Sequence, residues 1–257
     1  MIAEIERKLK FQFREDTNDS LIFKEIFDRN AYRLPEKFLA GDIIIDIGSH
    51  LGFFTYAVVQ HGARNVYAIE ADAENYKMAA ENLKDYINQG IVSLIWGAVW
   101  RSDSSEEVLY HSGYSRKYEC DLTSTLINTG VGDVIWQTQG NMVPAISFDS
   151  LVLRATENGQ KRIRLLKLDC EGSEWPILFT SKTLHLVDEI CGEFHELGGA
   201  YDDLKPPFSL QNLEQFTVDD LIRFLNEKNF DVVYSRLKRS DGLPSRLGIF
   251  FATHKSL

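Results

Sequence analysis

The sequence predicts an α/β protein: a mostly parallel seven-stranded sheet with helices on both faces and a C-terminal antiparallel hairpin. Short apolar runs recur along the chain, and the first, residues 43–47, is typical of a strand that is buried on both faces. Segments with helical apolar spacing alternate with these runs, as they do in parallel sheets. The last two runs, 230–237 and 247–253, flank a loop with Gly242 and Pro244, which suits a hairpin.

The first forty residues are expected to form a helical extension, and residues 41–257 the main domain. Asp19 or Ser20 can cap a helix that runs to Phe27, and Pro35 breaks the chain before the first strand. Alternating patterns then predict strand 43–47, helix 49–60, strand 65–69, helix 72–87 and strand 91–96.

The segment 101–144 is expected to be a partly stranded, lid-like insertion, because it is long, polar and rich in Gly, Ser and Thr. It carries several aromatic and imidazole side chains: Tyr110, His111, Tyr114, Tyr118 and Trp136. Strand patterns resume after it, with a strand–helix pattern at 145–153, strands at 163–168 and 187–194, and a helix at 216–228 capped by Thr217.

Composition limits the classes of function. The chain has 257 residues, of which 44% are hydrophobic and 26% charged, and it lacks both an apolar run long enough to cross a bilayer and an N-terminal signal core. Its three cysteines include no C-x-x-C pair, which favours reduced thiols and a cytoplasmic location. The net charge of −10 argues against a nucleic-acid partner. We therefore expect neither a membrane nor a nucleic acid as partner.

The turn after strand 43–47 is the most informative part of the chain. Gly48 and Gly52 allow the backbone to approach a ligand closely, and Glu70 ends the next strand about 20 residues further on, the spacing at which an acid reaches a ribose diol. Dinucleotide sites need G-x-G-x-x-G, but here His50 takes the place of the middle glycine and Asp46 adds a carboxylate. S-adenosylmethionine fits, because it carries a ribose and positive charge but no phosphate. The structural alternative is a strand–turn–helix whose glycines only make a tight turn.

This interpretation gives a set of expected cofactor-binding residues. Asp46 and Gly48 are expected to frame the methionine end, Glu70 to bind the ribose, and Ala98 to lie near the adenine. The full set is Asp46, Gly48, Ser49, His50, Gly52, Glu70, Ala71, Gly97 and Ala98.

Three segments carry a resemblance to a known family: Asp46–Gly52 (DIGSHLG), Tyr67–Ala71 (YAIEA) and above all Leu166–Glu174 (LKLDCEGSE). With them the chain resembles the class I S-adenosylmethionine-dependent methyltransferases, and among these the FkbM family. His50 stands where members commonly have Asn, and Cys170 where they have Val. The resemblance covers roughly residues 19–253. It implies a Rossmann-like sheet and an O-methyltransferase of sugar or secondary-metabolite hydroxyls, hence a small hydroxylated acceptor.

The expected catalytic residues follow two strands. In the fold that the resemblance implies, strand 163–168 is next to strand 43–47, so Asp169 would face the reacting methyl group. Glu171 and the strand residue Lys167 are near it in sequence, while Glu193 and His195 share one face of the next strand. A carboxylate can orient an acceptor hydroxyl, and a neighbouring carboxylate or imidazole can accept its proton. The same Asp, Glu and His side chains could instead hold a divalent cation, which we do not favour.

Two other functions stay open at this point. A non-catalytic nucleoside- or S-adenosylmethionine-binding module would keep Glu70 and the glycines, but would have no use for Asp169, Glu193 and His195. A small-molecule N-methyltransferase is the second alternative. Nucleobase N-methylation is disfavoured, because no N/D-P-P-Y/F string follows strand 163–168.

Overall fold

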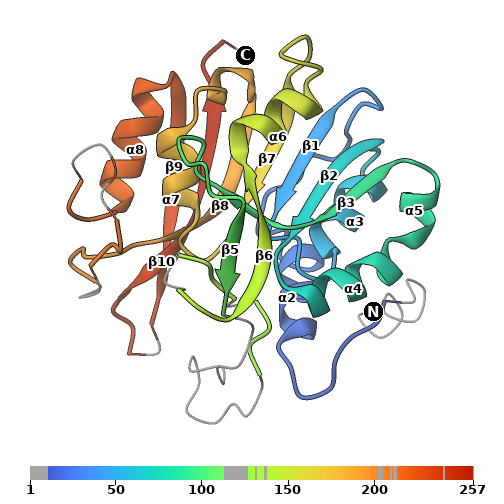
Figure 1. Cartoon of the computed structure of the whole chain (residues 1–257), viewed down its shortest axis with the longest axis horizontal. Helices are drawn as coiled ribbons and strands as arrows, with labels where there is room; N and C mark the ends of the chain where they lie inside the picture. The colour runs from blue at the N-terminus through green and yellow to red at the C-terminus, as the bar shows by residue number, and fades with distance from the viewer. Residues whose placement is uncertain are drawn as a thin grey trace.

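The computed structural model describes residues 11–112, 127–130, 132–135, 138–201, 205–208, 210, 213–239 and 241–256. Within them, seven strands form one sheet in the order β3-β2-β1-β7-β8-β10-β9 (Figure 1). These strands are β1 (Ile43–Ile47), β2 (Asn65–Glu70), β3 (Val92–Trp96), β7 (Ile163–Leu168), β8 (Glu189–His195), β9 (Phe230–Lys238) and β10 (Pro244–His254). Strands β3, β2, β1, β7 and β8 pair in parallel, whereas β10 is antiparallel to both β8 and β9. The predicted fold class is confirmed.

Helices cover both faces of this sheet. One face carries α2 (Asp19–Phe27), α3 (Phe53–Gln60), α4 (Ala73–Asn82) and α5 (Lys84–Asn88). The other carries α6 (Phe148–Ala155), α7 (Glu174–Thr180) and α8 (Val218–Glu227), with a short 3₁₀ turn at Leu184–Leu186. No helix of the described residues is both long and apolar enough to cross a membrane.

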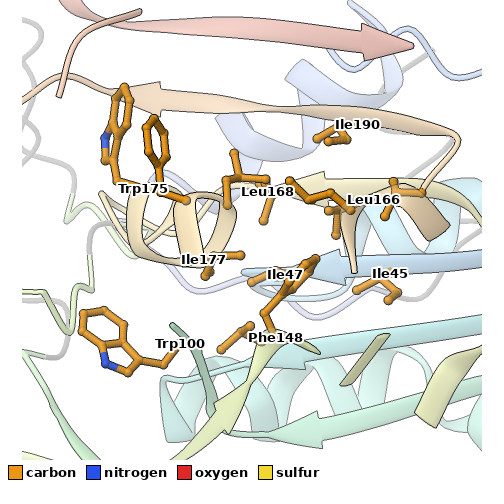
Figure 2. Close-up of a cluster of buried hydrophobic side chains, with 14 of the residues drawn as sticks. Ile45, Ile47, Trp100, Phe148, Leu166, Leu168, Trp175, Ile177 and Ile190 are labelled. Carbon is orange, nitrogen blue, oxygen red and sulfur yellow. The ribbon is translucent and has the colours of Figure 1, made fainter. Parts of the chain in front are cut away.

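Alternation along the strands divides the core into two. Ile43, Ile45 and Ile47 of β1 pack on the side of α6, α7 and α8, while Ile44 packs on the opposite side. Figure 2 shows the first of these clusters: side chains of β1, β7 and β8 lie on one face of the sheet and meet Phe148, Trp175 and Ile177 from the helices. Continuous apolar strands are thus explained by burial on both faces.

The second core joins the N-terminal extension to the main domain. The ring of Phe53 in α3 lies 5.3 Å from that of Phe11 and 5.5 Å from that of Phe23 in α2, both edge-on. Edge-to-face aromatic pairs at such distances add about 0.5–1.5 kcal/mol each to the energy of burial. The described part of the extension therefore packs against the sheet helices rather than standing apart from them.

Part of the predicted insertion is stranded. β4 (Ala98–Trp100), β5 (Val108–His111) and β6 (Asn141–Ser147) form a second, three-stranded sheet, which Figure 1 shows near the centre of the view. Leu109 and Val143 of this small sheet belong to the same core as β1 and β7. The lid residues Tyr114, Tyr118 and Trp136 lie outside the described residues. The division into extension, domain and lid stays a prediction.

Three helix boundaries differ from the sequence predictions. The helix expected from residue 49 begins at Phe53, because Gly48, His50 and Gly52 have left-handed φ angles of 75°, 52° and 85°. The helix expected over 72–87 is split into α4 and α5 at Leu83. The N-cap position of α2 is Asn18, whereas the predicted cap Asp19 is fully buried and bonds Arg14 instead. The predicted cap of α8 is confirmed, since the Thr217 hydroxyl accepts a hydrogen bond from the Asp220 N–H.

Candidate active site

A cavity of about 320 Å³ opens beyond the carboxyl ends of β1, β2, β7 and β8. β1 lies between β2 and β7, where the strand order reverses, and α/β sheets bind their ligands at such switch points. The cavity is lined by most of the residues singled out from the sequence: Gly48, Ser49, His50, Glu70, Ala71, Gly97, Ala98, Lys167, Asp169, Glu171, Glu193 and His195. Asp46 and Gly52 are the two that do not line it. The two predicted groups of site residues thus meet around a single cavity.

The turn after β1 depends on its glycines for reasons of space as well as of backbone angle. A Cβ on Gly48 would lie 1.8 Å from the carbonyl oxygen of Asp169, so the ends of β1 and β7 could not approach as they do. A Cβ on Gly52 would lie 2.6 Å from the Leu83 side chain. Gly52 therefore serves the packing of the turn against the helices and not the cavity.

Glu70 is held by the backbone of two loops. Its carboxylate accepts hydrogen bonds from the N–H of His50 at 2.7 Å and from the N–H of Asp72 at 2.9 Å, one on each oxygen. Burial raises the pKa of Glu70 to about 7, although these two hydrogen bonds act in the opposite direction. Each oxygen keeps a further lone pair, so the carboxylate can accept two hydroxyl groups from a ribose diol.

Buried polar atoms around the cavity have no hydrogen-bond partner within the described residues. They are Ser49 Oγ, His50 Nδ1, Asn75 Oδ1 and Ser173 Oγ, and all four residues line the cavity with at most 8% of their surface exposed. Unpaired buried polar groups are costly and uncommon in folded proteins. These atoms, together with the Glu70 carboxylate, fit a ligand rich in hydroxyl, amino and ring-nitrogen groups, and S-adenosylmethionine has all three.

His50 contacts two segments that border the cavity, the N-terminal segment and residues 127–130. Its Nε2 lies 2.9 Å from Thr129 Oγ1 and 3.3 Å from Arg14, and Thr129 in turn donates to Asp19 at 2.6 Å. Burial lowers the pKa of His50 to about 3, so the ring is neutral. The Nε2 edge of the His50 ring is thus held by Thr129 and Arg14, while Nδ1 on its other edge is available to bond a ligand.

Lys167 forms a buried ion-pair network with Asp46 and Asp169. Its Nζ lies 3.3 Å from Asp46 and 3.5 Å from Asp169, and it donates to the carbonyl oxygen of Gly48 at 2.6 Å. Burial by itself lowers the pKa of Lys167, but the two carboxylates outweigh it and raise the pKa. Asp46 was expected to contact the methionine end directly. In the structure Asp46 does not line the cavity: it is fully buried, accepts a hydrogen bond from Thr55 at 2.7 Å and pairs with Lys167, and its contact with the cofactor stays a prediction.

A cluster of carboxylates surrounds His195. Its Nδ1 lies 2.8 Å from Glu174 Oε1, and its Nε2 lies 3.4 Å from Glu171 Oε2. Burial lowers the pKa of His195, but Glu174 and Glu171 outweigh it and raise the pKa to about 10. Burial raises the pKa of Glu171 to about 7, against the influence of His195. The two carboxylates thus favour the protonated form of His195, and its role as a proton acceptor stays a prediction.

Asp169, Glu193 and His195 also satisfy the geometry of a cation site, because one ligand atom from each lies within 4.8 Å of the others. Burial, and next the charge of Asp169, raises the pKa of Glu193 well above its usual value. A divalent cation would neutralise the same like charges that raise this pKa, so the chelator test described below decides between the predicted cation site and an ion-free cluster.

Residues that the sequence analysis did not select complete the site. The Tyr32 hydroxyl donates to Asp169 Oδ2 at 2.9 Å across 137 positions of sequence, and Glu25 and Thr129 line the cavity. No local pattern marks these three residues. Glu174, in contrast, is part of the LKLDCEGSE segment, but the sequence does not show its contact with His195.

Comparisons with known proteins give one family match and several remotely similar structures. The family model of the methyltransferase FkbM domain matches residues 46–232. Among solved structures, a methyltransferase FkbM from Methylobacillus flagellatus is 12% identical, with a TM-score of 0.47, over 90% of this chain and 48% of the other. Precorrin-6y C5,15-methyltransferase from Geobacter metallireducens is 10% identical, with a TM-score of 0.43, over 95% and 94%.

The other comparisons add little. TrmK from M. capricolum, in complex with S-adenosyl-homocysteine, is 11% identical with a TM-score of 0.43, and the match covers 89% of this chain and 68% of the other. No curated protein matches the chain. The family assignment therefore depends on the family model, which spans most of the chain from β1 into β9. The chain belongs to the FkbM family of S-adenosylmethionine-dependent methyltransferases.

Proposed function

We propose that this protein is an O-methyltransferase that transfers a methyl group from S-adenosylmethionine to a hydroxyl of a sugar or secondary-metabolite acceptor. The observation that carries the proposal is that the Gly48 turn and Glu70 share one cavity with Asp169, Glu171 and His195. A module that only binds nucleosides gains nothing from the second group, because three ionisable side chains in a cavity raise the cost of its desolvation.

The cofactor end of the cavity supports S-adenosylmethionine as the donor. Glu70 would bind the ribose hydroxyls, the unpartnered atoms of Ser49, His50 and Asn75 would take up further polar groups, and Ala71, Gly97 and Ala98 would border the adenine. When bound, the cofactor supplies an activated methyl group on its sulfonium and leaves as a neutral thioether. The protein's own task is then to align an acceptor oxygen with that methyl group and to remove a proton.

The acceptor end supports a small, uncharged or cationic substrate. Glu25, Asp169, Glu171 and Glu193 all line the cavity, so a phosphate-rich acceptor would be repelled. The net charge of −10 acts in the same direction at long range. We therefore propose that no nucleic acid is a substrate. We propose a cytoplasmic location on the basis of cysteine usage, and Cys170 and Cys191 are free thiols.

Transfer of a radiolabelled methyl group to a panel of acceptors tests the proposed function. The panel should contain matched pairs that differ only in a hydroxyl or an amino group, and tRNA as a polyanionic acceptor. Label in the hydroxyl members supports the proposal, and label only in the amines indicates the N-methyltransferase. Binding of the cofactor with no transfer to any member would indicate the non-catalytic module. Loss of transfer in EDTA that is restored by Mg²⁺ would show that a divalent cation is needed.

Replacing Glu70 by alanine is expected to weaken the binding of S-adenosylhomocysteine about tenfold or more. The reason is the loss of charge-assisted hydrogen bonds to the ribose, each worth about 1.5–3 kcal/mol. Calorimetry measures the affinity directly. Because the pKa of Glu70 is raised to about 7, the wild-type affinity should also fall as the pH drops from 8 to 6, where the carboxylate becomes protonated.

Glu74→Ala is the matched control, since Glu74 is exposed in the first turn of α4 and does not line the cavity. Its affinity should equal that of the wild type. Equal affinity in Glu70→Ala, with the fold intact, would contradict the assignment of the cofactor end.

Trypsin cleavage within segment 101–144 is expected to slow when S-adenosylhomocysteine is added, because Thr129 of this segment lines the cavity and bonds Asp19 and His50. Arg116 and Lys117 are the cleavage sites to follow. Lys161 lies in the exposed turn between α6 and β7 and is the internal control. Slowing at 116–117 with unchanged cleavage at Lys161 supports a lid, and equal rates at both sites with saturating ligand would contradict it.

A further inference from the structure

We propose that Thr129 is a positioning residue that turns the acceptor edges of His50 and Asn75 toward the cavity, where they bind an amino group of the cofactor. This inference rests on the proposed function, because it takes S-adenosylmethionine as the ligand. The sequence predicts His50 as a cofactor-binding residue, whereas no local pattern marks Thr129 or Asn75.

The first step of the argument is how residues 127–130 are held against the N-terminal segment. The N–H of Ile127 donates to the carbonyl oxygen of Asp16 at 2.8 Å, and the N–H of Asn18 donates to that of Ile127 at 3.0 Å. Asn18 Oδ1 accepts a hydrogen bond from the N–H of Thr129 at 2.9 Å. Thr129 itself is 1% exposed. Its backbone is therefore fixed beside the cavity by bonds to a distant part of the chain.

The second step is the direction of the hydrogen on the Thr129 hydroxyl. Oγ1 lies 2.6 Å from Asp19 Oδ1 and 2.9 Å from Asn18 Oδ1, and both oxygens are acceptors. A hydroxyl has one hydrogen, so it points to one of these oxygens and presents a lone pair to His50 Nε2 at 2.9 Å. Nε2 is then the nitrogen that carries the proton of the neutral ring, and Nδ1 is an acceptor.

The charges beside the ring agree with this assignment. Burial lowers the pKa of His50 to about 3, and Arg14, 3.3 Å from Nε2, acts in the same direction against Asp19 at 3.5 Å. Arg14 gives hydrogen bonds to both oxygens of Asp19, at 2.9 and 3.0 Å. Burial raises the pKa of Asp19, but the hydrogen bonds from Arg14 and Thr129 outweigh it and lower the pKa. Asp19 thus remains a carboxylate that accepts, and His50 a neutral ring.

The third step is that Thr129 also fixes the amide of Asn75. Asn75 Nδ2 donates to the carbonyl oxygen of Thr129 at 3.0 Å, so Oδ1 lies on the other side of the amide. His50 Nδ1 and Asn75 Oδ1 are both buried and have no hydrogen-bond partner within the described residues. Both residues line the cavity. One threonine therefore leaves two acceptors that require a donor from a ligand.

The chemistry of the cofactor indicates which donor this is. S-adenosylmethionine donates hydrogen bonds only through its two ribose hydroxyls, its adenine amino group and its α-ammonium group. Each hydroxyl has a single hydrogen, and in the proposed site Glu70 accepts both. The two amino groups remain, and each has at least two hydrogens. An amino group that reaches these acceptors removes the cost of leaving them buried and unpaired.

NMR of the protein with isotope-labelled histidine rings tests the positioning role without any ligand. The resonances of His50 are assigned with His50→Gln. In the wild type at neutral pH, Nε2 should carry the proton and Nδ1 should not. Thr129→Val removes the lone pair that Nε2 faces, so the proton should be shared between the two nitrogens, and Thr129→Ser should restore the wild-type tautomer. Thr253→Val, at an exposed position of β10 away from the cavity, is the matched control and should change nothing.

A proton on Nδ1 of the wild-type ring would overturn the proposal. That tautomer is the one that donation from Arg14 to Nε2 would favour. The measurement needs only the wild type and the assignment, so it decides the matter even if Thr129→Val fails to fold.

Calorimetry with analogues of S-adenosylhomocysteine tests the ligand group. Thr129→Val should weaken the binding of S-adenosylhomocysteine about 3–10-fold, the effect of losing one oriented hydrogen bond, and Thr129→Ser should bind like the wild type. One analogue has hydrogen in place of the α-amino group, and the inosine analogue has oxygen in place of the adenine amino group. The effect of Thr129→Val should shrink or vanish with the analogue that lacks the bound amino group.

Three outcomes of the calorimetry have distinct meanings. A full effect of Thr129→Val with both analogues contradicts an amino group as the ligand. Wild-type affinity for S-adenosylhomocysteine in a folded Thr129→Val contradicts the positioning role. Absence of binding by the wild type contradicts the proposed function instead, and the tautomer of His50 still decides the role of Thr129.

Discussion

Replacing Glu171 by glutamine is expected to lower the turnover for methyl transfer by about 10²–10⁴-fold, the usual contribution of a general base. Glutamine keeps the shape of the side chain but cannot accept a proton. The affinity for S-adenosylhomocysteine should stay close to that of the wild type, because Glu70 and the turn at Gly48 are unchanged. Single-turnover rates with labelled donor, together with calorimetry of the product, separate the two effects.

Glu227→Gln is the control for this prediction. Glu227 is exposed at the end of α8 and does not line the cavity. Its turnover should remain within a few-fold of the wild type. If Glu171→Gln transfers methyl groups at the wild-type rate while Asp169→Asn loses activity, Asp169 is the base. In that case the contacts of Asp169 with Tyr32 and Lys167 hold the base in place at the cavity.

Replacing Trp175 by alanine is expected to lower the free energy of unfolding by about 3–5 kcal/mol, as other large aromatic truncations in cores do. Trp175 is fully buried in α7, and its ring stacks on Phe216 at 5.4 Å between centroids. Figure 2 shows it within the cluster that joins α7 to β7 and β8. Urea unfolding followed by circular dichroism gives the free energy and its denaturant slope.

Trp175→Phe separates packing from hydrogen bonding. The indole Nε1–H donates to the carbonyl oxygen of His195 at 2.7 Å, so phenylalanine keeps most of the buried area but leaves that oxygen unpaired. The expected loss is about 1–3 kcal/mol, smaller than for alanine. A loss below about 1 kcal/mol for Trp175→Ala would show that the cluster does not depend on this ring.

Much of the fold was determined by local sequence patterns. Buried parallel strands need continuous apolar runs, and a run such as residues 43–47 can satisfy burial on both faces only inside such a sheet. The carboxyl ends of parallel strands meet at one edge. For that reason Asp169, which follows β7, could be placed from the sequence together with Glu193 and His195 at the end of β8.

The structure corrected expectations wherever the cause lies far away in sequence. Nothing near Gly48 indicates that the carbonyl of Asp169 occupies the space of a Cβ, or that left-handed angles delay the start of α3 to Phe53. Asp46, a predicted cofactor-binding residue, does not line the cavity, and its ion-pair partner Lys167 comes from the neighbouring strand β7. The small sheet of β4, β5 and β6 likewise joins segments that the sequence pattern treats separately.

The sequence by itself determined the fold class, the glycine turn and the acid at the end of β2, because these follow from periodicity and spacing within short segments. Only the tertiary structure decided the carboxylate contacts of His195 and the contact of Tyr32 with Asp169. A pKa is set by burial and by every charge within a few ångströms, whichever part of the chain supplies it. Here the charged side chains come from β7, β8 and α7, and residues of α2 line the cavity beside them. The chemistry of the site therefore exists only once these elements are packed together.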